Sequence, residues 1–170
     1  GNPDKTESPY ELNITYCSAL GGPDVSHEQH LRRFLTSQAV MLALPGMPGI
    51  YFHSLVGTPN YHQGVQESGH ARRINRRRYD LAELVQAVTG SESTQAQVFN
   101  GYQHLLATRI AQPAFHPDGD QEVMDLGRDD VVAFARTSPN GDQTIHIVAN
   151  LRGEVATVPL PRNHGVDLLT

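Results

Sequence analysis

The chain contains one cysteine, no tryptophan and no apolar stretch long enough to cross a bilayer. Because a disulfide needs two cysteines, the single Cys17 excludes an internal disulfide and is consistent with a reducing compartment. A membrane-spanning helix requires about 20 predominantly apolar residues in a row. We therefore expect no membrane partner and a cytoplasmic location.

Basic side chains are outnumbered, since 13 lysines and arginines stand against 18 aspartates and glutamates, for a net charge of −5. A general nucleic-acid binder presents a basic surface to phosphates, so no nucleic-acid partner is expected. Nine histidines are present, but the pair His27 and His30 lacks acidic or cysteine companions at metal-ligand spacing, and the loop histidines show no metal pattern. We accordingly expect no metal and no other cofactor.

Helical signals fall in the first two thirds of the chain. The segment from Gly1 to Gly22 is punctuated by proline and glycine and is expected to have little regular structure. Three helices are then predicted from apolar residues at helical spacing that follow a capping pair. Their spans are Ser26 to Leu44 with the pair Ser26 and Gln29, Asp80 to Gly90 with Asp80 and Glu83, and Thr94 to Ile110 with Thr94 and Gln97.

From Ala114 onward the apolar spacing changes to two, which is typical of strands. Val131 to Thr137 and Thr144 to Asn150 are rich in β-branched residues, and the Asn140-Gly141 pair between them indicates a hairpin turn. Two further short strands are predicted at Val155 to Leu160 and Val166 to Leu169. We expect residues 114–170 to form a small antiparallel β-domain.

Between the first two helices, a helix stop, a short strand and a long polar loop follow one another. Pro45 and Gly46 end the helix, because proline cannot continue the amide ladder and glycine tolerates the exit conformation. Gly49 to His53 is predicted to be a mostly apolar strand covered on both faces, as in a parallel sheet. The loop of roughly twenty residues that follows is longer than most connections, and such loops are usually functional or disordered.

Five arginines lie between Arg72 and Arg78 in this otherwise acidic chain. A solvated charge cluster is the simplest interpretation of such a run, and we keep it for Arg73, Arg77 and Arg78. Planar guanidinium groups also bind anions in a bidentate manner, so an anion site is the alternative.

Several of these segments together resemble the α-amylase superfamily, and within it the sucrose-phosphorylase-like enzymes. The similar runs are Tyr10 to Tyr16, the helix from Ser26, Leu44-Pro45-Gly46-Met47-Pro48, Gly49-Ile50-Tyr51-Phe52 and Arg72-Arg73-Ile74-Asn75-Arg76. The resemblance implies that residues 1–113 are the C-terminal tail of a (β/α)8 catalytic barrel whose last strand is Gly49 to His53. It also implies that residues 114–170 are the β-domain that follows the barrel. A complete barrel needs about 250 residues, more than the 170 present.

The activity implied by the resemblance is the retaining transfer of an α-glucosyl unit to inorganic phosphate, which releases α-glucose 1-phosphate. Sucrose, sucrose 6′-phosphate and glucosylglycerate remain open as the sugar substrate, although the run from His53 to Gly57 is more like enzymes that use the last two. The catalytic carboxylates of such enzymes are expected before Gly1, so no catalytic residue is assigned in this chain and the isolated chain is expected to be inactive. The carboxylates near the start do not follow a strand and do not replace them; they are Asp4, Glu7, Glu11 and Asp24.

Barrel enzymes carry their sites at the C-terminal ends of strands, which points to His53 and the loop after it. By resemblance, Arg72 helps to hold the glucosyl unit, and Asn75 and Arg76 belong to the same element. The loop before it is expected to shape the acceptor side. Its candidate polar contacts are Asn60, His62 and Gln63.

The alternative is a non-catalytic module, in which the β-domain serves packing, assembly or carbohydrate contact. The absence of tryptophan and the aromatic content of 6% weaken the carbohydrate version, since sugar-binding faces usually expose aromatic rings. A strand at Gly49 to His53 without neighbours would have unpaired edges. We therefore expect association with the missing N-terminal part of the barrel or with a second copy, or else a rearranged helical region.

Overall fold

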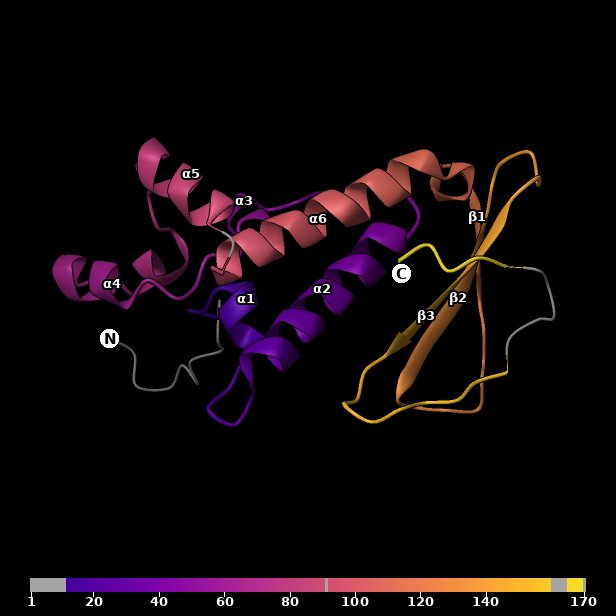
Figure 1. The fold of residues 1–170 in the computed structure, drawn as a ribbon, viewed down its shortest axis with the longest axis horizontal. Coiled ribbons are helices and arrows are strands. Elements are labelled where there is room, and N and C mark those ends of the chain that lie inside the picture. Colours follow the sequence, from indigo (N-terminus) through magenta and orange to yellow (C-terminus); the bar gives the residue numbers. More distant parts are fainter. Residues whose placement is uncertain (1–11, 91, 160–164, 170) are drawn as a thin grey trace, which may run out of the picture.

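The computed structural model describes residues 12–90, 92–159 and 165–169. Helices occupy the first part of the chain, and an antiparallel sheet lies at one end of the two longest helices (Figure 1). Tyr10 and the carboxylates Asp4, Glu7 and Glu11 lie outside the described residues. Within those residues, no helix combines the length and the apolarity that a bilayer crossing demands.

The two longest helices, α2 (His27–Ala43) and α6 (Thr94–Ala111), pack side by side (Figure 1). The capping box predicted for α2 is confirmed: Ser26 Oγ accepts from the Gln29 amide at 3.2 Å, and the Gln29 side chain accepts from the Ser26 amide at 3.3 Å. The predicted capping pair of α6 is wrong by one position. Its cap is Ser93, which accepts from the Ala96 amide at 3.0 Å.

The helix predicted from Asp80 is also present, as α5 (Leu81–Thr89), and Asp80 accepts from the Ala82 amide at 2.9 Å. The side chain of Glu83 does not complete a box, because it pairs with Arg77. A short helix, α1 (Tyr16–Ala19), interrupts the segment expected to be irregular. Thr15 caps it by accepting from the Ser18 amide at 3.2 Å, a local signal within a polar stretch.

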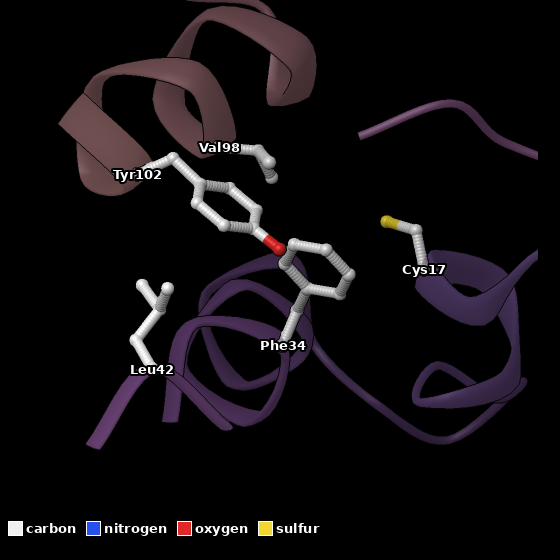
Figure 2. Packing of buried hydrophobic residues seen from close by; sticks show 5 residues of the cluster. All are labelled: Cys17, Phe34, Leu42, Val98 and Tyr102. Atoms are coloured by element: carbon white, nitrogen blue, oxygen red, sulfur yellow. The ribbon is translucent and has the colours of Figure 1, made fainter. Parts of the chain in front are cut away.

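The core lies where α1, α2 and α6 meet. Figure 2 shows Phe34 and Leu42 of α2 facing Val98 and Tyr102 of α6, with Cys17 of α1 at the side. The Phe34 and Tyr102 rings meet edge to face with their centroids 6.2 Å apart, and the Tyr102 hydroxyl donates to Gln38. Burial raises the pKa of the Cys17 thiol to about 11, so this thiol stays protonated and behaves as a small core residue.

The strand predicted at Gly49 to His53 is wrong for this structure. Residues 47–51 have no regular structure, and the chain then turns into the short helix α3 (Phe52–Leu55). The described residues offer no neighbouring strand here, so a ladder cannot form, whereas a helical turn satisfies the backbone locally. The amide of Leu55 donates to the Tyr51 carbonyl at 3.0 Å, and that of Val56 to the Phe52 carbonyl at 3.2 Å.

The long loop that follows contains two elements that the sequence pattern did not predict. They are α4 (His62–Ser68) and the 3₁₀ helix η1 (Ala71–Asn75), which pack against each other. The amide of Tyr61, just before α4, donates to the Ile74 carbonyl in η1 at 2.8 Å. Gly69 lies between the two elements with a backbone φ of +66°, a conformation that residues other than glycine rarely adopt. A short turn thus folds η1 back against α4.

The sheet has the order β1-β2-β3 and is antiparallel throughout. Its strands are β1 (Asp120–Val123), β2 (Val131–Thr137) and β3 (Thr144–Asn150). The predicted hairpin is confirmed, with Thr137 opposite Thr144 and Gly141 at φ +76° in the turn. The β1 strand was not predicted because its sequence, Asp-Gln-Glu-Val, has three polar residues in a row and shows no apolar alternation.

The two further strands predicted near the C-terminus are wrong. Residues 155–159 and 165–169 lie outside the sheet, and Leu160 lies outside the described residues. The valines that suggested strands, Val155 and Val166, are 98% and 86% exposed. An apolar pattern produces a strand only where a partner strand and a buried face are available.

One buried arginine joins the sheet to the helices. Arg136 of β2 is fully buried and donates to the carbonyls of Ala43 at 2.9 Å and His116 at 2.8 Å. Its remaining bonds reach the carbonyls of Asp120 at 3.2 Å and Gly119 at 3.3 Å. Because Ala43 is the last residue of α2, the cation also meets the negative end of that helix dipole.

We expect replacement of Arg136 by methionine to lower the free energy of unfolding by about 3 kcal/mol, because it leaves buried carbonyls without donors. Urea unfolding followed by circular dichroism measures this difference. The matched control is Arg33→Met, which makes the same change at an exposed position of α2 and should alter stability by less than about 0.5 kcal/mol. Equal effects of the two substitutions would contradict the role given to Arg136.

Candidate functional site

A pocket of about 230 Å³ lies between the start of α1, the turn into α3 and the end of η1. Two of the residues predicted from the sequence, His53 and Asn75, line it together. The remaining lining residues are Ile14, Thr15, Tyr16, Tyr51 and Ser54. Aromatic rings, hydroxyl groups and one amide thus surround a space smaller than the roughly 300–1,000 Å³ of typical ligand pockets. Its size suits a single small ring.

His53 is one of the two buried polar side chains of this pocket, together with Thr15. It is 9% exposed, and its Nδ1 lies 3.0 Å from Oγ1 of the fully buried Thr58. The rings of Tyr51 and Phe52 pack edge-on against it at centroid distances of 5.2 and 5.3 Å. Burial lowers the pKa of His53. The imidazole is therefore neutral around neutral pH and acts as a hydrogen-bonding group rather than as a cation.

The two asparagines predicted as site residues hold the pocket wall. Asn75 donates from Nδ2 to the Ile14 carbonyl at 3.5 Å, and its own carbonyl accepts from the Tyr51 hydroxyl at 3.3 Å. The side-chain oxygen of Asn60 accepts from the Thr15 amide at 2.8 Å, and its backbone amide donates to Ser18 Oγ at 3.0 Å. These bonds fasten the loop to the start of α1.

A second, more open hollow of about 390 Å³ lies over η1. It brings together Arg72 and Arg76, both of which are exposed, with Arg73 as a third arginine. Its other lining residues are Gly69, His70 and Ala71. The Nε of Arg73 is buried and has no hydrogen-bond partner among the described residues. Three guanidinium groups around one hollow favour an anionic ligand.

His62 and Gln63 lie outside both hollows, on the exposed side of α4. The Gln63 amide donates to Glu67 Oε1 at 2.7 Å, one helical turn away. The structure therefore brings together His53 with Asn75 and Arg72 with Arg76. It does not join His62 or Gln63 to either pair.

Arg77 is a structural residue rather than part of a solvated cluster. Its guanidinium lies over the rings of Tyr79 at 4.6 Å and Tyr61 at 5.3 Å, and it forms an ion pair with Glu83 of α5. The contact holds the chain after η1 between the residue that precedes α4 and the first turn of α5. It fixes the backbone from which Arg72 and Arg76 project.

Sequence reasoning missed the tyrosines and the threonine that support this site. Tyr16 and Tyr51 line the pocket, Thr58 and Tyr79 stand behind His53, and Tyr61 holds Arg77. A usable signal was the repeated placement of tyrosine beside polar, glycine-containing segments in a chain with few aromatic residues. Across residues 12–90, 92–159 and 165–169, no three histidine, cysteine, aspartate or glutamate side chains gather as a metal ion would require.

Comparison with known proteins found no matching family model. The chain is 41% identical over 145 residues to the glucosylglycerate phosphorylase of Spirochaeta thermophila, which covers 85% of this chain and 24% of that protein. It is 31% identical over 169 residues to the glucosylglycerate phosphorylase of Escherichia coli, which covers 99% of this chain and 30% of that protein. This chain thus spans about a quarter to a third of the length of these relatives.

The fold is also similar to part of a solved structure. The crystal structure of sucrose 6F-phosphate phosphorylase from Thermoanaerobacter thermosaccharolyticum matches with a TM-score of 0.66 and 24% identity. The match covers 83% of this chain and 25% of that chain. Most of this fold is therefore similar to a part of a larger chain.

The buried state of His53 predicts a pH-dependent contribution to stability. Because the folded-state pKa lies below the unfolded value of about 6.5, this contribution is full above that value and is lost as the pH falls below it. We expect the difference in unfolding free energy between the wild type and His53→Gln to shrink from pH 7.5 to pH 5, roughly the range over which histidine titrates.

Urea unfolding at both pH values measures that difference. His62→Gln, the same substitution at an exposed site on α4, serves as the control. If the His53→Gln difference is the same at both pH values, His53 does not have the lowered pKa.

Proposed function

The chain belongs to the sucrose-phosphorylase-like enzymes, and from this membership we propose that it is the C-terminal part of a retaining, α-glucosyl-transferring sugar phosphorylase. The observation that carries this proposal is the similarity to glucosylglycerate phosphorylases of two bacteria across most of the chain. Glucosylglycerate is therefore the first substrate to test, and sucrose 6′-phosphate the second. Transfer of the glucosyl unit from glucosylglycerate to inorganic phosphate gives α-glucose 1-phosphate and releases glycerate.

Residues 1–113 form the tail of the catalytic barrel in this proposal, and residues 114–170 form the β-domain after it. Residues 49–51, which precede α3, pair in this proposal with a neighbouring strand that the rest of the enzyme supplies. The exposure of the apolar side chains around this segment supports the proposal. Met47, Tyr51 and Phe52 are 86%, 57% and 45% exposed and are available to pack against that neighbour.

The two hollows suggest that the sugar ring and the anionic group bind at different places. The pocket at His53 and Asn75 receives the glucosyl ring, and the arginine hollow, which Arg72 and Arg76 line, receives the anionic partner. A glycerate carboxylate and an inorganic phosphate are both suited to planar guanidinium donors. The nucleophile and the acid come from the rest of the enzyme, as two carboxyl groups about 5–5.5 Å apart.

The first test compares the isolated chain with a chimera in which the preceding part of the Spirochaeta thermophila glucosylglycerate phosphorylase is joined to this chain. We expect phosphate-dependent release of α-glucose 1-phosphate from glucosylglycerate by the chimera and none by the isolated chain. Release by the isolated chain would overturn the assignment of the carboxylates. A folded chimera without activity, beside an active parent enzyme, would favour the non-catalytic module.

A second test addresses Arg72 in the active chimera. Arg72→Lys keeps the positive charge but removes the planar pair of donors, so we expect kcat/KM to fall about 10- to 100-fold. Arg78→Lys is the matched control, because Arg78 is exposed, belongs to the same arginine run and does not line either hollow. An equal loss in both variants would assign the effect to the arginine run as a whole.

A further inference from the structure

A row of hydrogen bonds leads from α6 to the ring of His53. The side-chain amide nitrogen of Gln95 donates to the Tyr79 hydroxyl at 3.1 Å, and this hydroxyl donates to Thr58 Oγ1 at 3.1 Å. Thr58 Oγ1 in turn lies 3.0 Å from His53 Nδ1. The three supporting side chains come from separate parts of the chain and meet behind the pocket. Their order determines where each hydrogen lies.

The direction of the row follows from its first member. Since Gln95 donates to the Tyr79 oxygen, the hydrogen of that hydroxyl is free to point toward Thr58. The hydroxyl of Thr58 is fully buried, and its hydrogen has His53 Nδ1 as its acceptor among the described residues. If Nδ1 carried a hydrogen instead, the Thr58 hydrogen would have to turn to the Tyr79 oxygen, and the Tyr79 hydrogen would then lose Thr58 as its acceptor, which is costly.

We infer that Thr58 and Tyr79 are positioning residues that fix His53 in the neutral tautomer with its hydrogen on Nε2. His53 is then a hydrogen-bond donor to whatever occupies the pocket. The tautomer follows from the geometry alone, whereas the identity of the ligand, a sugar ring, rests on the proposed function. The lowered pKa of the ring agrees with a neutral imidazole.

The surroundings of His53 Nε2 suit an uncharged hydrogen-bond acceptor. Nε2 makes no hydrogen bond with the described residues, and it is not among the buried polar atoms that lack a partner, so it remains accessible. The pocket that His53 lines is bordered by Tyr16 and Tyr51, and no charged side chain lines it in the part of the chain that the structure describes. A neutral donor between aromatic rings suits an uncharged oxygen, such as a sugar hydroxyl, better than an anion. The anionic group is left to the arginine hollow.

NMR spectroscopy of the full chain, with histidine labelled by the NMR-active nitrogen isotope, tests the tautomer directly. Long-range correlations between ring protons and ring nitrogens distinguish a protonated Nε2 from a protonated Nδ1. His53→Gln identifies the signal by removing it. We expect the Nε2–H form to dominate by about tenfold or more, which corresponds to about 1.4 kcal/mol. A dominant Nδ1–H form would mean that the row runs the other way and would overturn the inference.

A single substitution should reverse the donor and acceptor roles in this row of hydrogen bonds. A carboxylate accepts hydrogen bonds but does not donate, so Gln95→Glu would accept from Tyr79, Tyr79 would accept from Thr58, and Thr58 would accept from Nδ1–H. We expect the His53 signal to change to the Nδ1–H form in this variant. Unchanged Nε2–H in a folded Gln95→Glu variant would show that the row does not control the tautomer.

Two variants of Thr58 separate positioning from a packing effect. Thr58→Val keeps the shape and removes the hydroxyl, so both tautomers should become populated, whereas Thr58→Ser keeps the hydroxyl and should retain Nε2–H. If Thr58→Val fails to fold, the Gln95→Glu result still decides the question. The measurement needs no turnover, so an inactive chimera would refute the proposed function and leave the tautomer unaffected.

Discussion

The whole arrangement depends on the buried guanidinium of Arg136. A cation without a carboxylate partner among the described residues is normally expensive to bury, yet here four carbonyl oxygens surround it. One of them ends α2, and the others belong to the segment that enters β1. Arg109 adds one bond to the carbonyl of Leu42 in the last turn of α2 and one to the carbonyl of Gly46 just after the helix. Backbone dipoles thus replace a counter-ion, and the sheet is held to the helix that leads into the site.

The site itself is assembled from short segments that would not be stable alone. The segments 14–16, 51–54, 58–62 and 71–79 meet through hydrogen bonds of Asn60, Asn75 and Thr58 and through the stacking of Arg77. Helix α6 supports them from behind, through Gln95 and through close packing of Val98 against Gly57. Polar contacts dominate this region, while the apolar core lies between α1, α2 and α6.

Local chemistry made part of this structure predictable. The capping box at Ser26, the cap at Asp80 and the Asn140-Gly141 turn are short-range signals, and each appears where the sequence places it. The strand predictions that failed, at Gly49 to His53 and at the valines near the C-terminus, concern segments that have no neighbouring strand among the described residues. Of the candidate site, Arg72 and Arg76 lie close together because they belong to one short element, whereas the sequence alone did not indicate that His53 and Asn75 line the same pocket. The tertiary roles of Thr58, Tyr79 and Arg77 depend on contacts that no local pattern encodes.

The bond between Arg136 and Ala43 also has a consequence for how the chain tolerates change in length. It spans 93 residues, and the entropy lost on closing a flexible loop grows only with the logarithm of its length. Doubling the intervening segment would add about 0.6 kcal/mol to that cost. The junction between sheet and helix therefore places little restriction on the number of residues between α2 and β2, and insertions in the segments that surround the pocket are compatible with the same docking.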